Sequence, residues 1–92
     1  MSAGDPPVLM YATSWCPYCE RARLLFAAKG VAVTEVDVEA TPGARELMHA
    51  RSGRTSVPQI FIGGHHIGGF DDTKALDAQG KLDPLLAATA GT

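Results

Sequence analysis

The chain has 92 residues, 46% of them hydrophobic and 20% charged, and a formal net charge of -2. This length and composition predict one folded globular domain, and the small net charge without a basic run argues against binding to nucleic acid. No apolar stretch is long enough to span a membrane, and residues 1–7 lack the basic and apolar regions of a signal peptide, so we expect a cytoplasmic protein.

The first half of the chain predicts a strand, a helix and a second strand, after a loose tail at residues 1–7. The apolar run Val8–Ala12 has the length of a strand that is buried on both faces. Residues 19–29 are predicted to form a helix, with Pro17 in its first turn and Gly30 as a left-handed stop. Alternating valines predict the second strand over residues 31–38.

The second half predicts a helix, a hairpin and two further helices. Residues 44–51 are expected to form a helix that turns Leu47 and Met48 inward. Residues 57–62 and 65–67 are expected to be antiparallel strands, joined by a Gly-Gly pair that is typical of hairpin turns. Helices are then expected over residues 70–78 and from about residue 81 to residue 88, followed by a tail at residues 89–92.

This order of elements predicts an α/β fold for a domain at residues 8–88. The initial strand–helix–strand unit requires a right-handed parallel crossover, and the hairpin adds an antiparallel edge. The expected result is a mixed four-stranded sheet with helices on both faces.

Both cysteines of the chain lie in the segment Trp15-Cys16-Pro17-Tyr18-Cys19. Two intervening residues place both sulfurs on the first turn of a helix, which suits a reversible disulfide or half of a zinc site. A zinc site needs two further ligands, and the available histidines form no close Cys/His knuckle with the pair. In a cytoplasmic protein the pair is therefore expected to be redox-active and not structural.

The two cysteines are expected to have different roles. The attacking group in disulfide exchange is the thiolate, and the unpaired N–H groups of a helix N-terminus favour that anion. Cys16 is nearer the helix N-terminus, so we expect it to be the more exposed, nucleophilic sulfur and Cys19 the resolving thiol. Tyr18 would offer a flat apolar face to a substrate. Trp15 either contacts substrates or packs beside the first strand, and the sequence leaves both possibilities open.

Three motifs resemble those of the dithiol glutaredoxins, in particular the bacterial type. Cys16-Pro17-Tyr18-Cys19 follows the first strand, Thr55-Ser56-Val57-Pro58 precedes the third, and Gly68-Gly69-Phe70-Asp71-Asp72 follows the fourth. The resemblance extends from Val8 to about Leu86. It implies a thioredoxin fold and a monomeric, glutathione-dependent disulfide oxidoreductase without a metal. It also implies glutathione, protein disulfides and glutathionylated proteins as partners.

The resemblance further implies where glutathione binds. A cis Val57-Pro58 bond would direct the N–H and C=O of Val57 toward the cysteinyl part of a substrate. From the residues alone, Pro58 could instead begin an edge strand in the trans form. The amides of Phe70 and Asp71 would receive the γ-glutamyl carboxylate, and Asp72 the ammonium group, although this segment also suits a simple helix cap. The expected binding residues are Thr13, Tyr18, Arg54, Ser56, Val57, Pro58, Gly69, Phe70, Asp71 and Asp72.

The chain also departs from the pattern it resembles. Thr13 stands where many glutaredoxins have a lysine beside the glycine carboxylate of glutathione, so a cation must come from Arg54 or Arg51 or be absent. Phe70 stands where several bacterial members have a cysteine. The consecutive histidines at positions 65 and 66 are expected on the hairpin surface, without a metal.

Two rival functions remain open. A thioredoxin-like protein served by a flavin reductase would have Gly-Pro between the cysteines, in place of Pro17-Tyr18. An iron–sulfur carrier would share a cluster between two chains through Cys16 and glutathione, and Pro17 disfavours this within the family.

Overall fold

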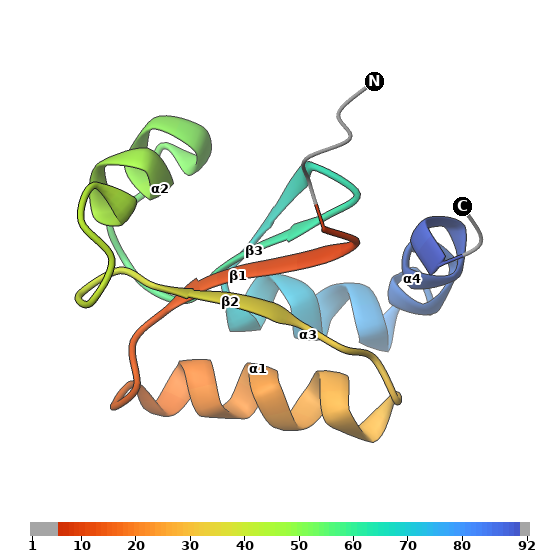
Figure 1. Ribbon diagram of the computed structural model, residues 1–92. Helices are drawn as coiled ribbons and strands as arrows, with labels where there is room; N and C mark the ends of the chain where they lie inside the picture. The colour runs from red at the N-terminus through yellow and green to blue at the C-terminus, as the bar shows by residue number, and fades with distance from the viewer. Residues whose placement is uncertain (1–5, 91–92) are drawn as a thin grey trace.

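The computed structural model describes residues 6–90 and contains a four-stranded sheet with four helices (Figure 1). The elements in chain order are β1 (Val8–Ala12), α1 (Pro17–Ala28), β2 (Thr34–Asp37), α2 (Ala44–Ser52), β3 (Gln59–Ile62), β4 (His65–Gly68), α3 (Phe70–Ala78) and α4 (Leu82–Ala90). Within residues 6–90, none of the helices has the length and apolar character that a membrane crossing requires. The predicted sequence of elements is confirmed.

The strands lie in the order β2-β1-β3-β4. β1 pairs with β2 in parallel and with β3 in antiparallel, and β3 pairs with β4 in antiparallel. The sheet is therefore mixed, as predicted, and the arrangement is a thioredoxin fold. It places the C-terminal end of β1, and the loop that follows, beside the start of β3.

The two faces of the sheet pack against different helices, as Figure 1 shows. Alternate residues of β1 enter two separate apolar clusters, because successive side chains of a strand point to opposite faces. Val8, Met10 and Ala12 pack with residues of α1 and α4, whereas Leu9 and Tyr11 pack with α2. β1 is thus buried on both faces, which explains its continuous apolar run.

Several boundaries differ from the sequence expectations. β2 is shorter than predicted and begins at Thr34, because the N–H of Val31 still bonds to the carbonyl of Phe26 at the end of α1. Its valines at positions 31 and 33 nevertheless pack against the core. β3 begins at Gln59 and not at residue 57, since Pro58 has no N–H for the ladder.

The expected burial of Leu47 is wrong. The side chain of Leu47 is 51% exposed, while Met48 is fully buried in the cluster beneath α2. On this short helix, Ala44 and Met48 are the buried residues, four positions apart, and Leu47 lies outside the stripe that faces the sheet.

The expected tails also need adjustment. The carbonyl of Pro7 accepts a hydrogen bond from the N–H of Gly63, so residue 7 is attached to the β3–β4 hairpin. At the other end, α4 continues to Ala90, two residues beyond the predicted end of the domain. The rest of the predicted tails, residues 1–5 and 91–92, lies outside the described part of the chain.

Candidate active site

Cys16 occupies the N-cap of α1. Its backbone is extended, and its Sγ accepts a hydrogen bond from the N–H of Cys19 at 3.4 Å. Pro17 forms the first helical position, where its missing N–H costs nothing. The N–H of Cys19, in the first helical turn, therefore points at the Cys16 sulfur.

Cys19 lies one turn further into the helix and is more deeply buried than Cys16. Their exposed fractions are 0% and 7%, and both are free thiols. Burial, and to a lesser extent the neighbouring Cys16, raises the pKa of Cys19 from its ordinary value of 9.0 to about 11. Cys19 therefore stays protonated near neutral pH. The expected order of exposure of the two sulfurs is confirmed.

The loop before β3 approaches Cys16 from the neighbouring strand. The Val57-Pro58 peptide bond is cis, as the resemblance implied. The Sγ of Cys16 donates a weak hydrogen bond to the carbonyl oxygen of Val57 at 3.8 Å. The backbone of Val57 thus lies beside the cysteine, where an extended cysteinyl chain could pair with it.

The N-terminus of α3 forms the other wall of the site. Gly69 is its N-cap, and Asp72 Oδ2 accepts a hydrogen bond from the N–H of Gly69 at 2.9 Å. The same oxygen lies 2.9 Å from Nη1 of Arg54. The bond from Gly69 and the guanidinium of Arg54 hold the pKa of Asp72 below its ordinary value, so this carboxylate is ionised at neutral pH.

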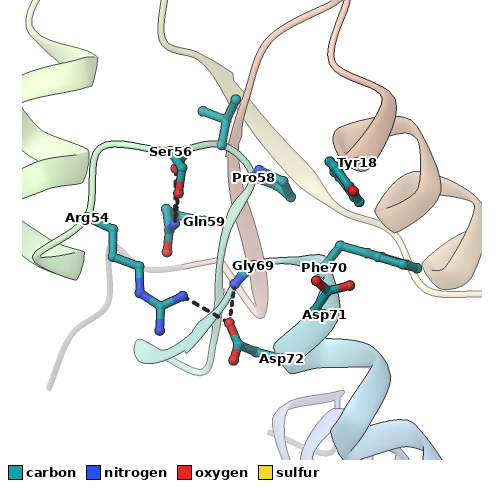
Figure 2. Close-up of a pocket in the computed structure, with 10 residues that line it drawn as sticks. Tyr18, Arg54, Ser56, Pro58, Gln59, Gly69, Phe70, Asp71 and Asp72 are labelled. Carbon is teal, nitrogen blue, oxygen red and sulfur yellow. Dashed lines mark hydrogen bonds and ion pairs between the residues drawn. The ribbon is translucent and has the colours of Figure 1, made fainter.

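A cavity of about 260 Å³ lies between these elements (Figure 2). Every residue that was predicted to bind glutathione, except Thr13, lines this cavity, and Gln59 completes the lining. The lining consists of Tyr18, Arg54, Ser56, Val57, Pro58, Gln59, Gly69, Phe70, Asp71 and Asp72. Three segments that are distant in sequence therefore meet around one hollow beside the cysteine pair.

Thr13 does not line the cavity, and its side chain is only 1% exposed. Thr13, which was expected among the glutathione-binding residues, therefore lies away from the cavity. Thr13 directly follows β1 and stays in the interior, and its carbonyl accepts a hydrogen bond from Nη2 of Arg23 at 3.0 Å. Arg23 is itself paired with Glu35 and Glu20. The guanidinium of Arg23 therefore holds the backbone that leads to Cys16. It does not take the place of the lysine that many glutaredoxins have at the position of Thr13.

The two arginines that were considered as substitutes for that lysine lie in different places. Arg54 reaches the cavity and pairs with Asp72. Arg51 instead stacks over the ring of Phe61 and donates a hydrogen bond to the hydroxyl of Tyr11, on the α2 face of the sheet. Arg54 is therefore the cation that the fold supplies to the cavity.

Sequence reasoning missed the role of Gln59. This side chain is buried, and its Nε2 donates to the carbonyl of Ser56 at 3.0 Å, as Figure 2 shows. Its Oε1 lies 2.7 Å from Nε2 of His66 on β4. His66 was expected on the hairpin surface, but it is half-buried, and its ring lies 5.0 Å from that of Phe61 at a tilt of 42°. The sequence did contain a signal for this contact, because Gln59 is a polar residue directly after Pro58 in an otherwise apolar strand.

Two aromatic residues, Trp15 and Tyr18, are close neighbours of Cys16 in the sequence, and of the two only Tyr18 lines the cavity. The ring of Tyr18 lies 6.5 Å from that of Phe70 at the cavity, and the guanidinium of Arg21 stacks on Tyr18. Trp15 lies outside the cavity lining and is 69% exposed, so it does not pack in the core. Its indole N–H donates to Oε1 of Glu39 at 2.8 Å.

Comparisons with known proteins agree with this geometry. A family model described as Glutaredoxin matches residues 8–67. Glutaredoxin 3 of Escherichia coli K12 is 54% identical over 79 residues, which cover 86% of this chain and 95% of that protein. A glutaredoxin of Pseudomonas aeruginosa is 49% identical over 83 residues, covering 90% and 99% of the two chains.

Solved structures give the same result. The solution structure of a glutaredoxin from Brucella melitensis has a TM-score of 0.75 and 53% identity over 86% of each chain. The crystal structure of a buckwheat glutaredoxin–glutathione complex has a TM-score of 0.87 and 29% identity, covering 91% of this chain and 79% of that one. With its Cys-Pro-Tyr-Cys pair at a helix N-terminus, the chain belongs to the glutaredoxin family of glutathione-dependent thiol–disulfide oxidoreductases.

Proposed function

We propose that Cys16 is the nucleophile and Cys19 the resolving thiol of this enzyme, and that glutathione binds in the cavity beside them. The observation that carries the proposal is the convergence of three segments on one hollow next to Cys16. The hollow combines an extended backbone at Val57, a helix N-terminus and an ionised carboxylate at Asp72.

These groups match the chemistry of glutathione from one end to the other. The cysteinyl backbone pairs with Val57, which directs the glutathione sulfur to Cys16. The α-carboxylate of the γ-glutamyl group binds the amides of Phe70 and Asp71 at the start of α3. The adjacent ammonium group binds Asp72, and Tyr18 covers the tripeptide from the side. Arg54 supplies a cation for a carboxylate of the ligand.

With a glutathionylated protein, the Cys16 thiolate attacks the glutathione sulfur. A Cys16–glutathione disulfide forms, and the protein sulfur leaves as a thiolate. The thiolate of a second glutathione then attacks the glutathione sulfur of this intermediate, releasing oxidised glutathione and restoring the Cys16 thiolate.

With a protein disulfide, Cys16 first forms a mixed disulfide with the substrate and releases one substrate thiolate. Cys19 then loses its proton and attacks the Cys16 sulfur, so the second substrate sulfur leaves and the substrate is fully reduced. The high pKa of Cys19 keeps it protonated until that step, which limits competition with Cys16 for the substrate.

Replacing each cysteine by serine tests the two roles. Cys16→Ser should abolish turnover of every substrate, because no other sulfur occupies the N-cap. Cys19→Ser should retain reduction of the mixed disulfide of glutathione and 2-mercaptoethanol and lose reduction of protein disulfides. The measurement couples glutathione oxidation to glutathione reductase. Equal activity of the two variants toward the mixed disulfide would contradict the assignment.

We also propose that the enzyme works as a monomer in the cytoplasm and needs no metal. A reducing glutathione pool keeps such a dithiol in its active form, which supports the location. The proposed site is built from one chain, which supports the monomer, and Pro17 disfavours the shared cluster of the iron–sulfur carriers.

A further inference from the structure

Trp15 is a large exposed ring directly before Cys16, and the proposed glutathione cavity does not use it. The exposed fraction of Trp15 is 69%, the highest among the large apolar residues that the structure exposes within residues 6–90. The cavity is bounded by the loop before β3 and by the start of α3, on the β3 and β4 side of Cys16.

Glu39, the partner of Trp15, lies on the opposite side of the cysteine. It follows β2, which is the other edge of the sheet. Trp15 and Glu39 therefore form a second flank of Cys16 toward β2, whereas the cavity lies toward β3, and β1 lies between these two strands in the sheet.

The ring of Trp15 is held in place although it is exposed. Its N–H donates to Oε1 of Glu39 at 2.8 Å, a hydrogen bond that the carboxylate charge strengthens. Glu39 is positioned in turn by Asp37, whose Oδ1 accepts the N–H of Glu39 at 2.9 Å and that of Ala40 at 3.2 Å. The polar atom of the indole is thereby satisfied, and an ordered apolar surface remains for contact.

The reaction itself requires a second flank. When the Cys16 thiolate attacks the glutathione sulfur, the Cys16–glutathione bond forms while the bond to the protein sulfur breaks, and the protein leaves as a thiolate that takes up a proton from water. Glutathione occupies the cavity during this step. The polypeptide carrying the leaving sulfur must therefore lie on surface outside the cavity and close to Cys16.

We propose that Trp15, held by Glu39, is the docking surface for the polypeptide part of the substrate. It contacts an apolar side chain next to the reacting cysteine of a glutathionylated or disulfide-bonded protein. This inference rests on the proposed function, and it assigns glutathione to one flank of Cys16 and the protein to the other. Trp15 then determines specificity for proteins, and Glu39 acts as a positioning residue.

The test compares two substrates of the same reaction, glutathionylated serum albumin and the mixed disulfide of glutathione and 2-mercaptoethanol. Trp15→Ala should raise KM for the albumin substrate fivefold or more, because an exposed aromatic anchor is lost. For the small substrate the change in KM should stay within twofold. Trp15→Phe, which keeps a ring, should recover most of the affinity for albumin.

Glu39→Ala should raise KM for albumin by a smaller factor and shift the fluorescence of Trp15 to longer wavelength, since the ring loses its anchor. Leu24→Ala is the matched control, because Leu24 is an exposed apolar residue of α1 that lies outside the cavity lining. It should leave KM for both substrates at the wild-type value. Thermal unfolding of each variant checks the fold.

Two outcomes would overturn the inference. An equal loss with both substrates would mean that Trp15 acts on Cys16 itself, and an unchanged KM for albumin would mean that the ring does not dock the protein. Failure of the proposed function is a separate result. It would appear as an inactive wild-type enzyme with the small substrate, or as an active Cys16→Ser variant.

Discussion

Nη1 of Arg54 lies 2.9 Å from Oδ2 of Asp72, so the cavity contains a cation and an anion in direct contact. Both side chains are about half exposed, and such a pair contributes only about 0–1 kcal/mol. Glutathione carries both an ammonium group and carboxylates. In the proposed complex it would therefore replace either partner of the pair at small cost.

Arg54→Ala should weaken glutathione binding modestly. The variant loses a cation that attracts a carboxylate of the ligand, and a rim interaction of about 0–1 kcal/mol corresponds to at most a fivefold rise in KM, by about 1.4 kcal/mol per factor of ten. The rise in KM should shrink at high salt, because salt also screens the attraction between Arg54 and the ligand carboxylate in the wild type. Lys74→Ala, which removes an exposed cation of α3 outside the cavity, is the control. A KM for glutathione that is equal in all three proteins would contradict the prediction.

Gly68→Ala should damage the site through Asp72. Gly68 has a φ of +124°, and a Cβ at this position would collide with the Asp72 carboxylate. We expect a loss of about 1 kcal/mol or more in the free energy of unfolding, together with a raised KM for glutathione.

Gly80→Ala separates these two effects. Gly80 also has a positive φ, of +72°, but a Cβ there would enter open space. It should therefore destabilise the protein without changing KM. Denaturant unfolding and steady-state kinetics measure both quantities, and a raised KM in the Gly80 variant would mean that general destabilisation explains the effect.

Gln59→Met should raise KM for glutathionylated substrates about three- to tenfold with little change in kcat. The variant keeps the side-chain volume but removes the donor to the Ser56 carbonyl, so the Val57 backbone loses its support. Losing this partly buried hydrogen bond also costs about 0.5–1.5 kcal/mol of stability.

Two variants control for that loss of stability. Ile60→Val, next along β3 and buried on the other face, should cost about 0.5–1.5 kcal/mol without affecting KM. His66→Phe removes only the second partner of Gln59 and should change KM less than Gln59→Met does. If Ile60→Val raises KM as much as Gln59→Met, the positioning role of Gln59 is wrong.

Cys19 should make the protein sensitive to alkali. Its folded-state pKa of about 11 lies above the ordinary 9.0, so the unfolded chain releases the proton first. The stability that this thiol contributes is fully present below pH 9 and is lost as the pH rises toward 11. Cys19→Ser lacks this titration. The free energy of unfolding of the wild type should fall relative to that of the variant over this range, and parallel pH profiles would contradict the prediction.

The sequence alone determined the elements and the chemistry of the cysteine pair, because both depend on local patterns. The apolar run Val8–Ala12 predicted a strand buried on both faces, and Gly30 followed the end of the first helix as expected. The spacing of Cys16 and Cys19 placed both sulfurs on one helical turn. The set of cavity residues, however, came from a resemblance and not from any local rule.

Only the tertiary structure decided where the side chains that meet across the sheet would lie. Thr13 was expected to bind glutathione, but it is buried, because the end of β1 lies in the core where Arg23 bonds to the Thr13 carbonyl. Gln59 and His66 belong to different strands, so their contact follows from the β3–β4 register.

The contact between Trp15 and Glu39 was also decided by the tertiary structure. The sequence left open whether Trp15 lies in the core or at the surface, because burial depends on neighbours that are far away along the chain. Glu39 is 24 residues distant, and the parallel pairing of β1 with β2 brings the two loops together. Local periodicity predicts which face of a helix or strand is apolar, but the packing of the elements determines which residues that face contacts.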